Sequence, residues 1–173
     1  MNNKLKQYKN IFLDRDGIIN EVIIRNGLVS SPRNFDEFVI RNDFLNFIKL
    51  TNNNFNFFVM TNQPDIKRNL LSEADLKKMH FKLNSILNIK KIYVCRHDDS
   101  DMCMCRKPKP GMLLKALDEF NLKKSESLMI GDSFKDMQAA ESANIHGILL
   151  DTVYNKQVKY KHKFTNLVDL LSS

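Results

Sequence analysis

The sequence lacks any long hydrophobic run. Its longest apolar stretches, such as residues 55–60 and 127–130, are far shorter than the roughly 20 residues that a membrane-spanning helix needs. Residues 1–9 are polar and carry lysines, and the apolar stretch that follows, 11–13, is too short for the apolar region of a secretory signal. We therefore expect no membrane segment and a cytoplasmic location.

The chain also lacks internal repeats and low-complexity linkers. Its 173 residues are 43% hydrophobic and 27% charged, which is the composition of an ordinary globular protein. This length is enough for one well-buried core and short for two independent domains. We predict a single domain over residues 1–173, and we expect a monomer.

Acidic residues are outnumbered, because 27 lysines and arginines stand against 20 aspartates and glutamates and give a net charge of +7. A continuous basic face is typical of proteins that bind nucleic acid. Here the lysines are dispersed, and their densest stretch, 156–163, lies near the end of the chain. The charge pattern therefore does not predict a nucleic-acid partner.

Apolar runs alternate with helical patterns along the chain. Runs typical of buried strands occupy residues 10–13, 55–60, 91–94, 127–130 and 145–150. Helical patterns occupy residues 42–50, 76–87, 112–120 and 134–143. Asn26-Gly27 predicts a small hairpin after the first strand. Strands that alternate with helices predict an α/β fold with a doubly wound, mostly parallel sheet.

Polar residues that can bind a cation and a phosphoryl group follow the predicted strands. In such sheets, ligands bind beyond the carboxyl ends of the strands. The residues found there are Asp14, Asp16, Thr61, Asn62, Lys107, Asp132 and Asp136. Acids, a hydroxyl, an amide and a lysine on one rim predict a site for magnesium and a phosphoryl group.

Four segments in order resemble the motifs of the haloacid dehalogenase superfamily. They are FLDRDG at 12–17, MTNQ at 60–63, RKP at 106–108 and GDSFKD at 131–136. The resemblance implies a Rossmann-like fold and hydrolysis through an aspartyl-phosphate on Asp14. It further implies that Asp16 carries protons and binds Mg²⁺ through its carbonyl, and that Asp14 and Asp132 complete the Mg²⁺ site.

The same resemblance assigns the remaining site residues. Thr61 and Asn62 are expected to bind the phosphoryl oxygens, with Gln63 beside them at the substrate. Lys107 is expected to neutralise charge between Asp14 and the phosphate, and Asp136 to act outside the metal shell. The short spacings between the motifs leave no room for a large cap domain. The loops 18–33 and 64–71 and the cysteine-rich loop are therefore expected to select the substrate.

All three cysteines lie in one short stretch. Cys95, His97, Cys103 and Cys105 supply three thiolates and one imidazole, which is a complete tetrahedral set for structural Zn²⁺. The alternative is a group of reduced, packed cysteines beside an unrelated histidine. A zinc-stabilised loop would fix Arg106 and Lys107, which follow Cys105 directly.

The cysteine loop and the segment 105–112, CRKPKPGM, resemble the D,D-heptose 1,7-bisphosphate phosphatases and the related histidinol-phosphate phosphatases. The heptose resemblance is closer and implies removal of the C7 phosphate of a sugar bisphosphate, with Arg106 at the other phosphate or the sugar. Two positions depart from it: Pro64-Asp65 stands where Ser-Gly is usual, and Ser133 where a lysine is common. A histidinol-phosphate phosphatase and a nucleic-acid 3′-end phosphatase remain the alternatives.

Overall fold

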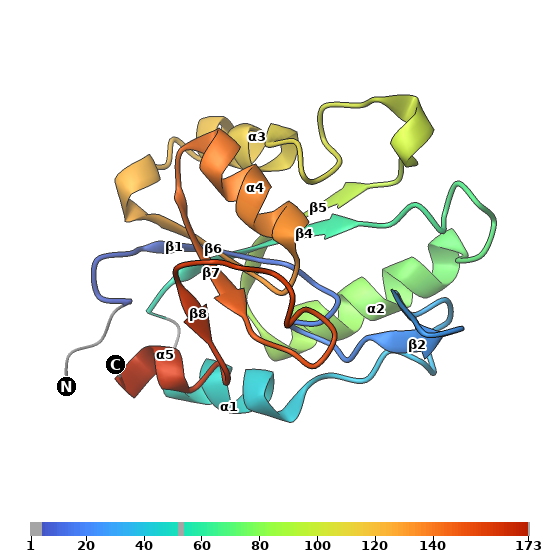
Figure 1. Ribbon diagram of the computed structural model, residues 1–173, viewed down its shortest axis with the longest axis horizontal. Coiled ribbons are helices and arrows are strands. Elements are labelled where there is room, and N and C mark those ends of the chain that lie inside the picture. The colour runs from blue at the N-terminus through green and yellow to red at the C-terminus, as the bar shows by residue number, and fades with distance from the viewer. Residues whose placement is uncertain (1–4, 52–53, 173) are drawn as a thin grey trace.

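The computed structural model describes residues 5–51 and 54–172; the remaining residues of the predicted domain, 1–4, 52–53 and 173, lie outside the described part. Its centre is a six-stranded sheet in which every pair of neighbours is parallel (Figure 1). The strands, in sheet order, are β5 (Ile89–Cys95), β4 (Asn56–Asn62), β1 (Asn10–Leu13), β6 (Ser127–Gly131), β7 (His146–Leu150) and β8 (Lys163–Phe164). The order reverses at β1, so the predicted doubly wound parallel sheet is confirmed.

Helices cover both faces of this sheet. In Figure 1, α3 (Gly111–Glu119) and α4 (Phe134–Ala143) lie above it, and α1 (Asn42–Thr51), α2 (Glu73–Ile86) and α5 (Asp169–Ser172) lie below it. Short 3₁₀ helices, η1 (Asp99–Asp101) and η2 (Lys124–Glu126), complete the described helical segments.

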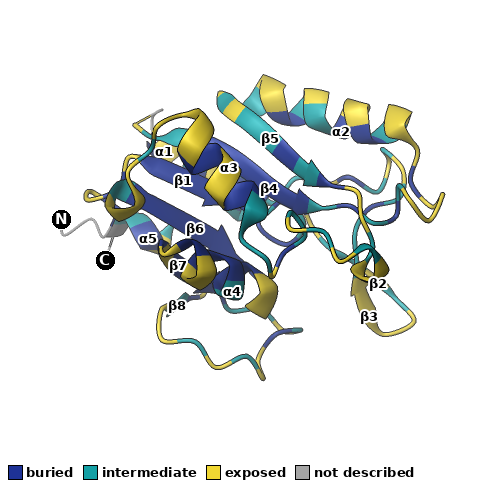
Figure 2. Ribbon diagram, turned by 90° about the horizontal axis from the view of Figure 1, so that it is seen from above, coloured by how far each residue is buried: buried dark blue, intermediate teal, exposed yellow. Residues whose placement is uncertain are grey.

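Alternate strand residues build two hydrophobic cores. Ile11 and Leu13 of β1 face α1 and α2, whereas Phe12 between them faces α3 and α4. The same alternation runs through β4 and β6, whose residues are buried on both faces (Figure 2). This explains why the strands read as continuous apolar runs in the sequence.

Local signals set the ends of the helices. The side chain of Ser72 accepts a hydrogen bond from the Asp75 backbone N–H and caps α2, as its sequence predicts. In α4, Ser133 and Asp136 form a reciprocal capping box. The sequence did not indicate β8 or α5, which are short and lie near the carboxyl terminus.

The hairpin predicted at Asn26-Gly27 stands apart from the main sheet. It consists of β2 (Ile23–Arg25) and β3 (Leu28–Ser30), and both turn residues have positive φ angles, 51° and 75°. Between β1 and α1 it is the only regular element of the described chain, so the expected absence of a large cap is confirmed. None of the described helices combines the length and the apolar character that a membrane crossing requires.

Candidate active site

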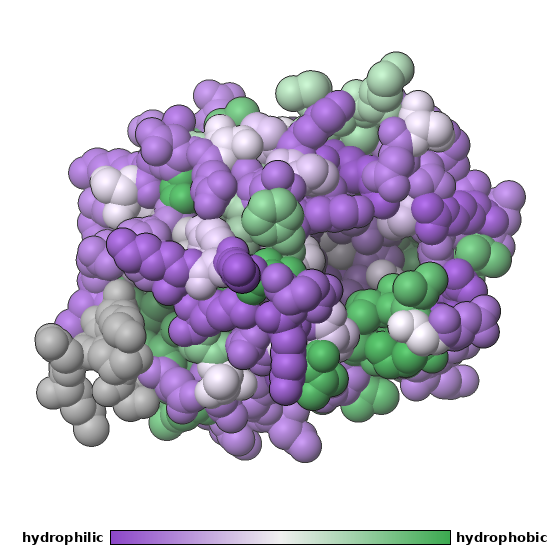
Figure 3. All heavy atoms as spheres, in the orientation of Figure 1, coloured by the Kyte–Doolittle hydropathy of each residue, from purple (hydrophilic) through white to green (hydrophobic). Residues whose placement is uncertain are grey.

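A cavity of about 780 Å³ opens at the carboxyl ends of the central strands. Its floor carries Asp14, Asp132 and Lys107, and its walls include the hairpin and the loops 62–68 and 133–135. The surface is hollowed beside hydrophobic side chains over β2 (Figure 3), where Leu28 and Val29 line the mouth. The cavity therefore has charged side chains of both signs at its floor and apolar side chains at part of its mouth.

Lys107 is the buried cation of the floor. Its Nζ lies 2.8 Å from Asp14 Oδ1 and 2.5 Å from Asp136 Oδ1, and its side chain is only 4% exposed. Burial alone would lower the pKa of Lys107, but the charges of Asp136 and Asp14 outweigh it and raise that pKa. The ammonium therefore stays charged beside the carboxylate that is expected to attack phosphorus.

Three carboxylates lie close together around Lys107. Oxygens of Asp14, Asp132 and Asp136 lie within 4.8 Å of one another. Burial raises the pKa of Asp14 well above its usual range, and burial together with Asp136 raises the pKa of Asp132 to about 7. Such crowding of negative charge favours a further cation, and a set of carboxylate oxygens suits Mg²⁺.

Both carboxylate oxygens of Asp136 already have partners. Its Oδ1 pairs with Lys107, while its Oδ2 accepts hydrogen bonds from the Ser133 backbone N–H at 3.0 Å and hydroxyl at 2.6 Å. The contacts of Asp14, from Lys107 and from the Arg15 backbone N–H, both fall on Oδ1. The residues present therefore fit Mg²⁺, with Asp14 and Asp132 as the carboxylates that could hold it and Asp136 outside the shell.

Backbone geometry brings Asp132 against the first motif. Gly17, at φ +90°, lies so close that an added Cβ would overlap the Asp132 carboxylate. On the other side, the Tyr154 hydroxyl donates to Asp132 Oδ2 at 2.6 Å, and the Asn155 amide donates to the Asp132 carbonyl at 2.5 Å. The loop after β7 thus supports the residue at the end of β6.

Asp16 is not free in this structure. Arg15, Asn20, Ser31 and Gln63 all donate to its carboxylate, at 2.7–3.1 Å. Burial would raise the pKa of Asp16, but the charge of Arg15 and the hydrogen bonds from Asn20 and Ser31 outweigh it, so the pKa is lowered. The carboxylate is therefore held ionised by these four donors.

The second motif is placed differently from expectation. Thr61 and Gln63 are fully buried and do not line the cavity. The Gln63 amide donates to Asp16 and to Thr61, both at 2.7 Å, so Gln63 connects two motifs instead of facing the substrate. Asn62 does line the cavity, but its side chain is bonded in both directions to the Lys107 backbone, at 2.9 and 3.1 Å. It fixes the position of the lysine.

The predicted zinc ligands come together in one cluster. Cys95, Cys103 and Cys105 have Sγ–Sγ separations of 3.4, 3.5 and 3.7 Å, and His97 Nδ1 lies 3.2 Å from Cys105 Sγ and 3.6 Å from Cys95 Sγ. Zn–S bonds of about 2.3 Å in a tetrahedron place sulfurs roughly 3.8 Å apart. The cluster thus fits a structural Zn²⁺, and no disulfide joins its cysteines.

Ion pairs connect the loops around the cavity mouth. Asp65, nearly buried, accepts from Arg33 at 2.8 Å and from Arg68 at 3.3 Å, and Arg68 also pairs with Asp98 of the cysteine loop. Arg106 pairs with Asp99 at 2.7 Å in the same loop. The departure at Pro64-Asp65 therefore supplies the carboxylate that joins the hairpin side to the loop after β4.

Comparisons with known proteins identify the family. Residues 31–144, about two thirds of the chain, match the haloacid dehalogenase-like hydrolase model. The chain belongs to the haloacid dehalogenase-like hydrolases. The matched span contains the second, third and fourth motifs, and the first motif lies before it. The resemblance predicted from the four motifs is confirmed.

Relatives along nearly the whole length are more specific. D-glycero-alpha-D-manno-heptose-1,7-bisphosphate 7-phosphatase of Campylobacter jejuni is 37% identical over 95% of this chain and 94% of its own. The D-glycero-beta-D-manno enzyme of Neisseria meningitidis is 34% identical over 89% and 83%. A crystal structure of the B. bronchiseptica D,D-heptose 1,7-bisphosphate phosphatase, complexed with magnesium and phosphate, superposes with a TM-score of 0.79 at 27% identity, covering 92% of this chain and 93% of that one.

Several residues of this hydrolase site carried no signal in the sequence. Arg15 is fully buried beneath Asp16 and lies 5.6 Å from the centre of the Phe38 ring. Its place inside the first motif could have marked it, but its inward orientation could not be inferred. Ser31 and Tyr154 come from irregular segments, so only the fold shows what they contact.

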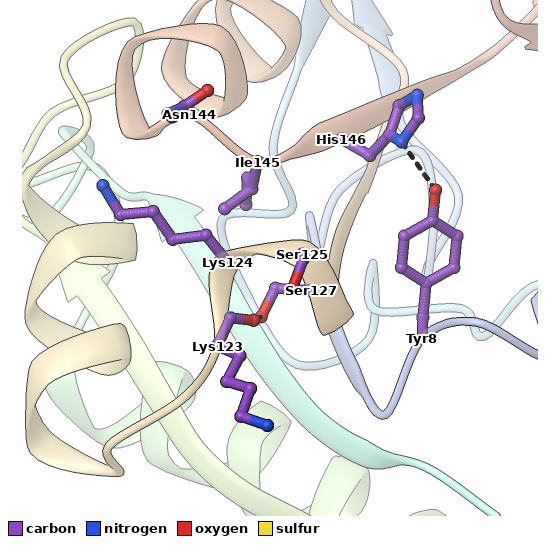
Figure 4. A pocket seen from close by; sticks show the side chains of 8 residues that line it. All are labelled: Tyr8, Lys123, Lys124, Ser125, Ser127, Asn144, Ile145 and His146. Atoms are coloured by element: carbon purple, nitrogen blue, oxygen red, sulfur yellow. Dashed lines mark hydrogen bonds between the residues drawn. The ribbon is translucent and has the colours of Figure 1, made fainter.

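A second cavity of this hydrolase, about 760 Å³, lies at the amino ends of β6 and β7, on the edge of the sheet opposite the active site (Figure 4). There the Tyr8 hydroxyl lies 2.7 Å from His146 Nδ1, and the His146 ring packs edge-on against His162. It contains none of the motif residues, and its Lys123 and Lys124 are exposed side chains at the start of η2.

Proposed function

We infer that this enzyme, a phosphatase of the haloacid dehalogenase-like hydrolases, removes the C7 phosphate of D-glycero-D-manno-heptose 1,7-bisphosphate, as a step toward nucleotide-activated heptose. One observation carries the proposal: Asp14 lies paired with buried Lys107 at the floor of a cavity. The chain's relatives over nearly its full length are enzymes of that name.

The reaction proposed at the floor has two halves. In the first, an oxygen of Asp14 forms a bond to the phosphorus while the bond from phosphorus to the sugar oxygen breaks, leaving an aspartyl-phosphate. In the second, water hydrolyses that intermediate and regenerates Asp14. Lys107, already 2.8 Å from Asp14, offsets the negative charge that gathers there in both halves.

Asp16 is the proposed proton carrier. Its ionised form can take the proton from the attacking water in the second half of the reaction. To protonate the departing sugar oxygen in the first half, Asp16 has to carry the proton that it took from water in the preceding turnover, and its carboxyl has to leave Ser31 and Gln63 and turn toward the cavity that it lines. Proton transfer by Asp16 therefore requires its carboxyl to break the hydrogen bonds from Ser31 and Gln63.

Two metal ions complete the proposal. Asp14, Asp132 and the Asp16 carbonyl would hold Mg²⁺, which supplies positive charge beside the transferring phosphoryl group. The four-residue cluster at Cys95, His97, Cys103 and Cys105 would hold structural Zn²⁺. Its closed ligand set leaves no open position, so its proposed role is to fix the loop that carries Lys107.

Cationic side chains at the rim of the cavity could bind the second phosphate, which stays on the sugar. Arg33, Arg106 and Lys135 line the same cavity as Asp14. Both terminal nitrogens of Arg33 donate to no described residue, and Lys135 forms no hydrogen bond or ion pair with one. Donors of Arg33 and Lys135 without a described partner, above a floor where one phosphate is proposed to react, support a substrate with two phosphates.

The test is phosphate release from a defined panel in the presence of Mg²⁺. It contains both anomers of the heptose 1,7-bisphosphate, histidinol phosphate and a 3′-phosphorylated oligonucleotide, with Asp14→Asn as the inactive control. Preferential release from a heptose bisphosphate supports the proposal, and the preferred anomer defines the product. Preferential release from histidinol phosphate or the oligonucleotide would contradict the substrate, and release that persists in Asp14→Asn would contradict the nucleophile.

A further inference from the structure

Tyr154 makes a buried contact that the reaction described above does not use. It lies in the loop after β7 and lines the active-site cavity, and its hydroxyl donates to Asp132 Oδ2 at 2.6 Å. This distance is shorter than the roughly 2.7–2.8 Å typical of O–H···O bonds in general and lies in the range of charge-assisted bonds to a carboxylate. The tyrosine thus binds one of the two oxygens of a carboxylate placed in the Mg²⁺ site.

The loop around Tyr154 is held independently of that bond. Asn155, next in the chain, donates through its side-chain amide to the carbonyls of Asp132 and Leu150, at 2.5 and 2.7 Å. Its side-chain oxygen accepts from the Thr152 backbone N–H at 2.8 Å. Removing the hydroxyl of Tyr154 should therefore leave the loop in place and change only the hydrogen bond to Asp132.

Among the described residues, no side chain other than Tyr154 donates a hydrogen bond to the Asp132 carboxylate. Gly17 packs directly against it, and an added Cβ there would overlap it. Packing restricts where the carboxylate can go, and the hydrogen bond from the Tyr154 hydroxyl to Oδ2 determines that Oδ1 is the oxygen left for a cation. A carboxylate ligand whose second oxygen is bonded in this way keeps one rotamer and binds its cation without a further loss of side-chain entropy.

We propose that Tyr154 is a positioning residue for magnesium, which orients Asp132 so that Oδ1 faces the cation. The inference rests on the proposed Mg²⁺ site at Asp14 and Asp132 and not on the identity of the sugar. Loss of a partner of this kind typically costs 10- to 100-fold in metal affinity. Tyr154 therefore sets how tightly the enzyme holds its cation, and it does not touch the reacting atoms.

The test compares Tyr154→Phe with the wild-type enzyme in direct metal binding. Calorimetric titration with Mg²⁺ and electron paramagnetic resonance titration with Mn²⁺ report the dissociation constant without any substrate. We expect the constant to rise by about 10-fold or more, while kcat at saturating Mg²⁺ stays within about threefold of wild type. Unchanged Mg²⁺ and Mn²⁺ affinity in a folded Tyr154→Phe enzyme would overturn the proposal.

Two further variants separate the possible causes. Tyr93→Phe removes the same kind of bond, from a tyrosine hydroxyl to Glu119 at 2.8 Å, outside the cavity, and should bind both metals as wild type does. A matching loss in Tyr93→Phe would show a general effect of the substitution and reject the proposal. Asp132→Asn tests the Mg²⁺ site itself, and undiminished metal binding in this variant would reject that site and the proposal with it. If the wild-type enzyme is inactive toward the heptose bisphosphate but Tyr154→Phe still binds metal more weakly, only the proposed substrate is rejected.

Discussion

Replacing Lys107 by methionine should destabilise the protein through the carboxylates that it leaves behind. The side chain of Lys107 is 4% exposed, and its ammonium pairs with Asp14 and with Asp136, whose side chain is fully buried. Methionine keeps most of the volume and removes the charge. Breaking a buried ion pair by removing one partner costs about 3–5 kcal/mol, which for a domain of this size corresponds to a fall in Tm of roughly 6–20 °C.

The loss should depend on pH in a defined direction. Burial and the charge of Asp136 raise the pKa of both Asp14 and Asp132, whereas Lys107 lowers both. When folding raises the pKa of a carboxyl group, that group stabilises the folded protein at a pH below its pKa in the unfolded chain. This stabilisation is lost as the pH rises through the pKa in the folded protein, which is about 7 for Asp132. Lys107→Met should therefore lose less Tm at pH 5 than at pH 8.

Thermal unfolding in the presence of a chelator, at both pH values, measures this directly. The matched control is Lys163→Met, which breaks the more exposed pair with Asp151 and should cost no more than about 1 kcal/mol. The double variant Lys107→Met/Asp136→Asn should be more stable than Lys107→Met alone, because it removes one unpaired charge. Equal losses in the two single lysine variants, or strictly additive losses in the double variant, would refute the electrostatic reasoning.

Three other predictions concern the proton carrier, the rim and the zinc cluster. Ser31→Ala removes a donor to Asp16, which raises the pKa of Asp16, and should shift the alkaline limb of the kcat/KM profile, set by the acid of the first half-reaction, to higher pH; an unchanged limb would show that Asp16 does not set it. Arg33→Ala should raise KM for the bisphosphate about 10-fold or more and leave kcat/KM for the heptose 7-phosphate nearly unchanged; an equal effect on both would contradict its proposed phosphate. Metal analysis should find about one zinc per chain in the wild-type protein and none in Cys103→Ser, whose Tm should be lower; wild-type protein without zinc would contradict the cluster's proposed role.

The positions of the catalytic candidates could be predicted because they depend on strand ends. In a parallel sheet all carboxyl ends meet at one edge, and β1 lies between β4 and β6. Asp14 and Asp132 therefore had to be neighbours once the apolar runs were recognised as strands. The zinc-type cluster was predictable for a different reason, since its four ligands lie within eleven residues of sequence.

Side-chain direction could not be predicted in the same way. Asn62 and Gln63 follow a strand as expected, but one bonds to the backbone of Lys107 and the other points inward to Asp16. These orientations depend on loops more than 40 residues away along the chain. Tyr8 and His146 show the same limit, because their contact joins residues 138 positions apart.

Lys135 reaches the cavity from the start of a helix. It lies two residues beyond Ser133 and lines the cavity, although two residues along a helix turn a side chain by about half a circle. The helix begins only at Phe134, so Lys135 lies in its first turn. Side chains in a helix lean toward its amino end, which here faces the cavity. Lys135 thus supplies a cation at the same mouth where the related heptose enzymes commonly carry a lysine at the position of Ser133.

Substrate selection in an enzyme without a large cap depends on how firmly its loops are held. Asp65 connects Arg33, beyond the hairpin, with Arg68, and Arg68 connects to Asp98 of the cysteine loop. Exposed ion pairs contribute little individually, but Asp65 is nearly buried and accepts from two arginines. Since Asp65 stands where the resembling heptose enzymes usually have glycine, this departure adds a clamp that presents the free nitrogens of Arg33 to the cavity. We therefore expect it to refine recognition of the proposed second phosphate and to leave the proposed chemistry on Asp14 unchanged.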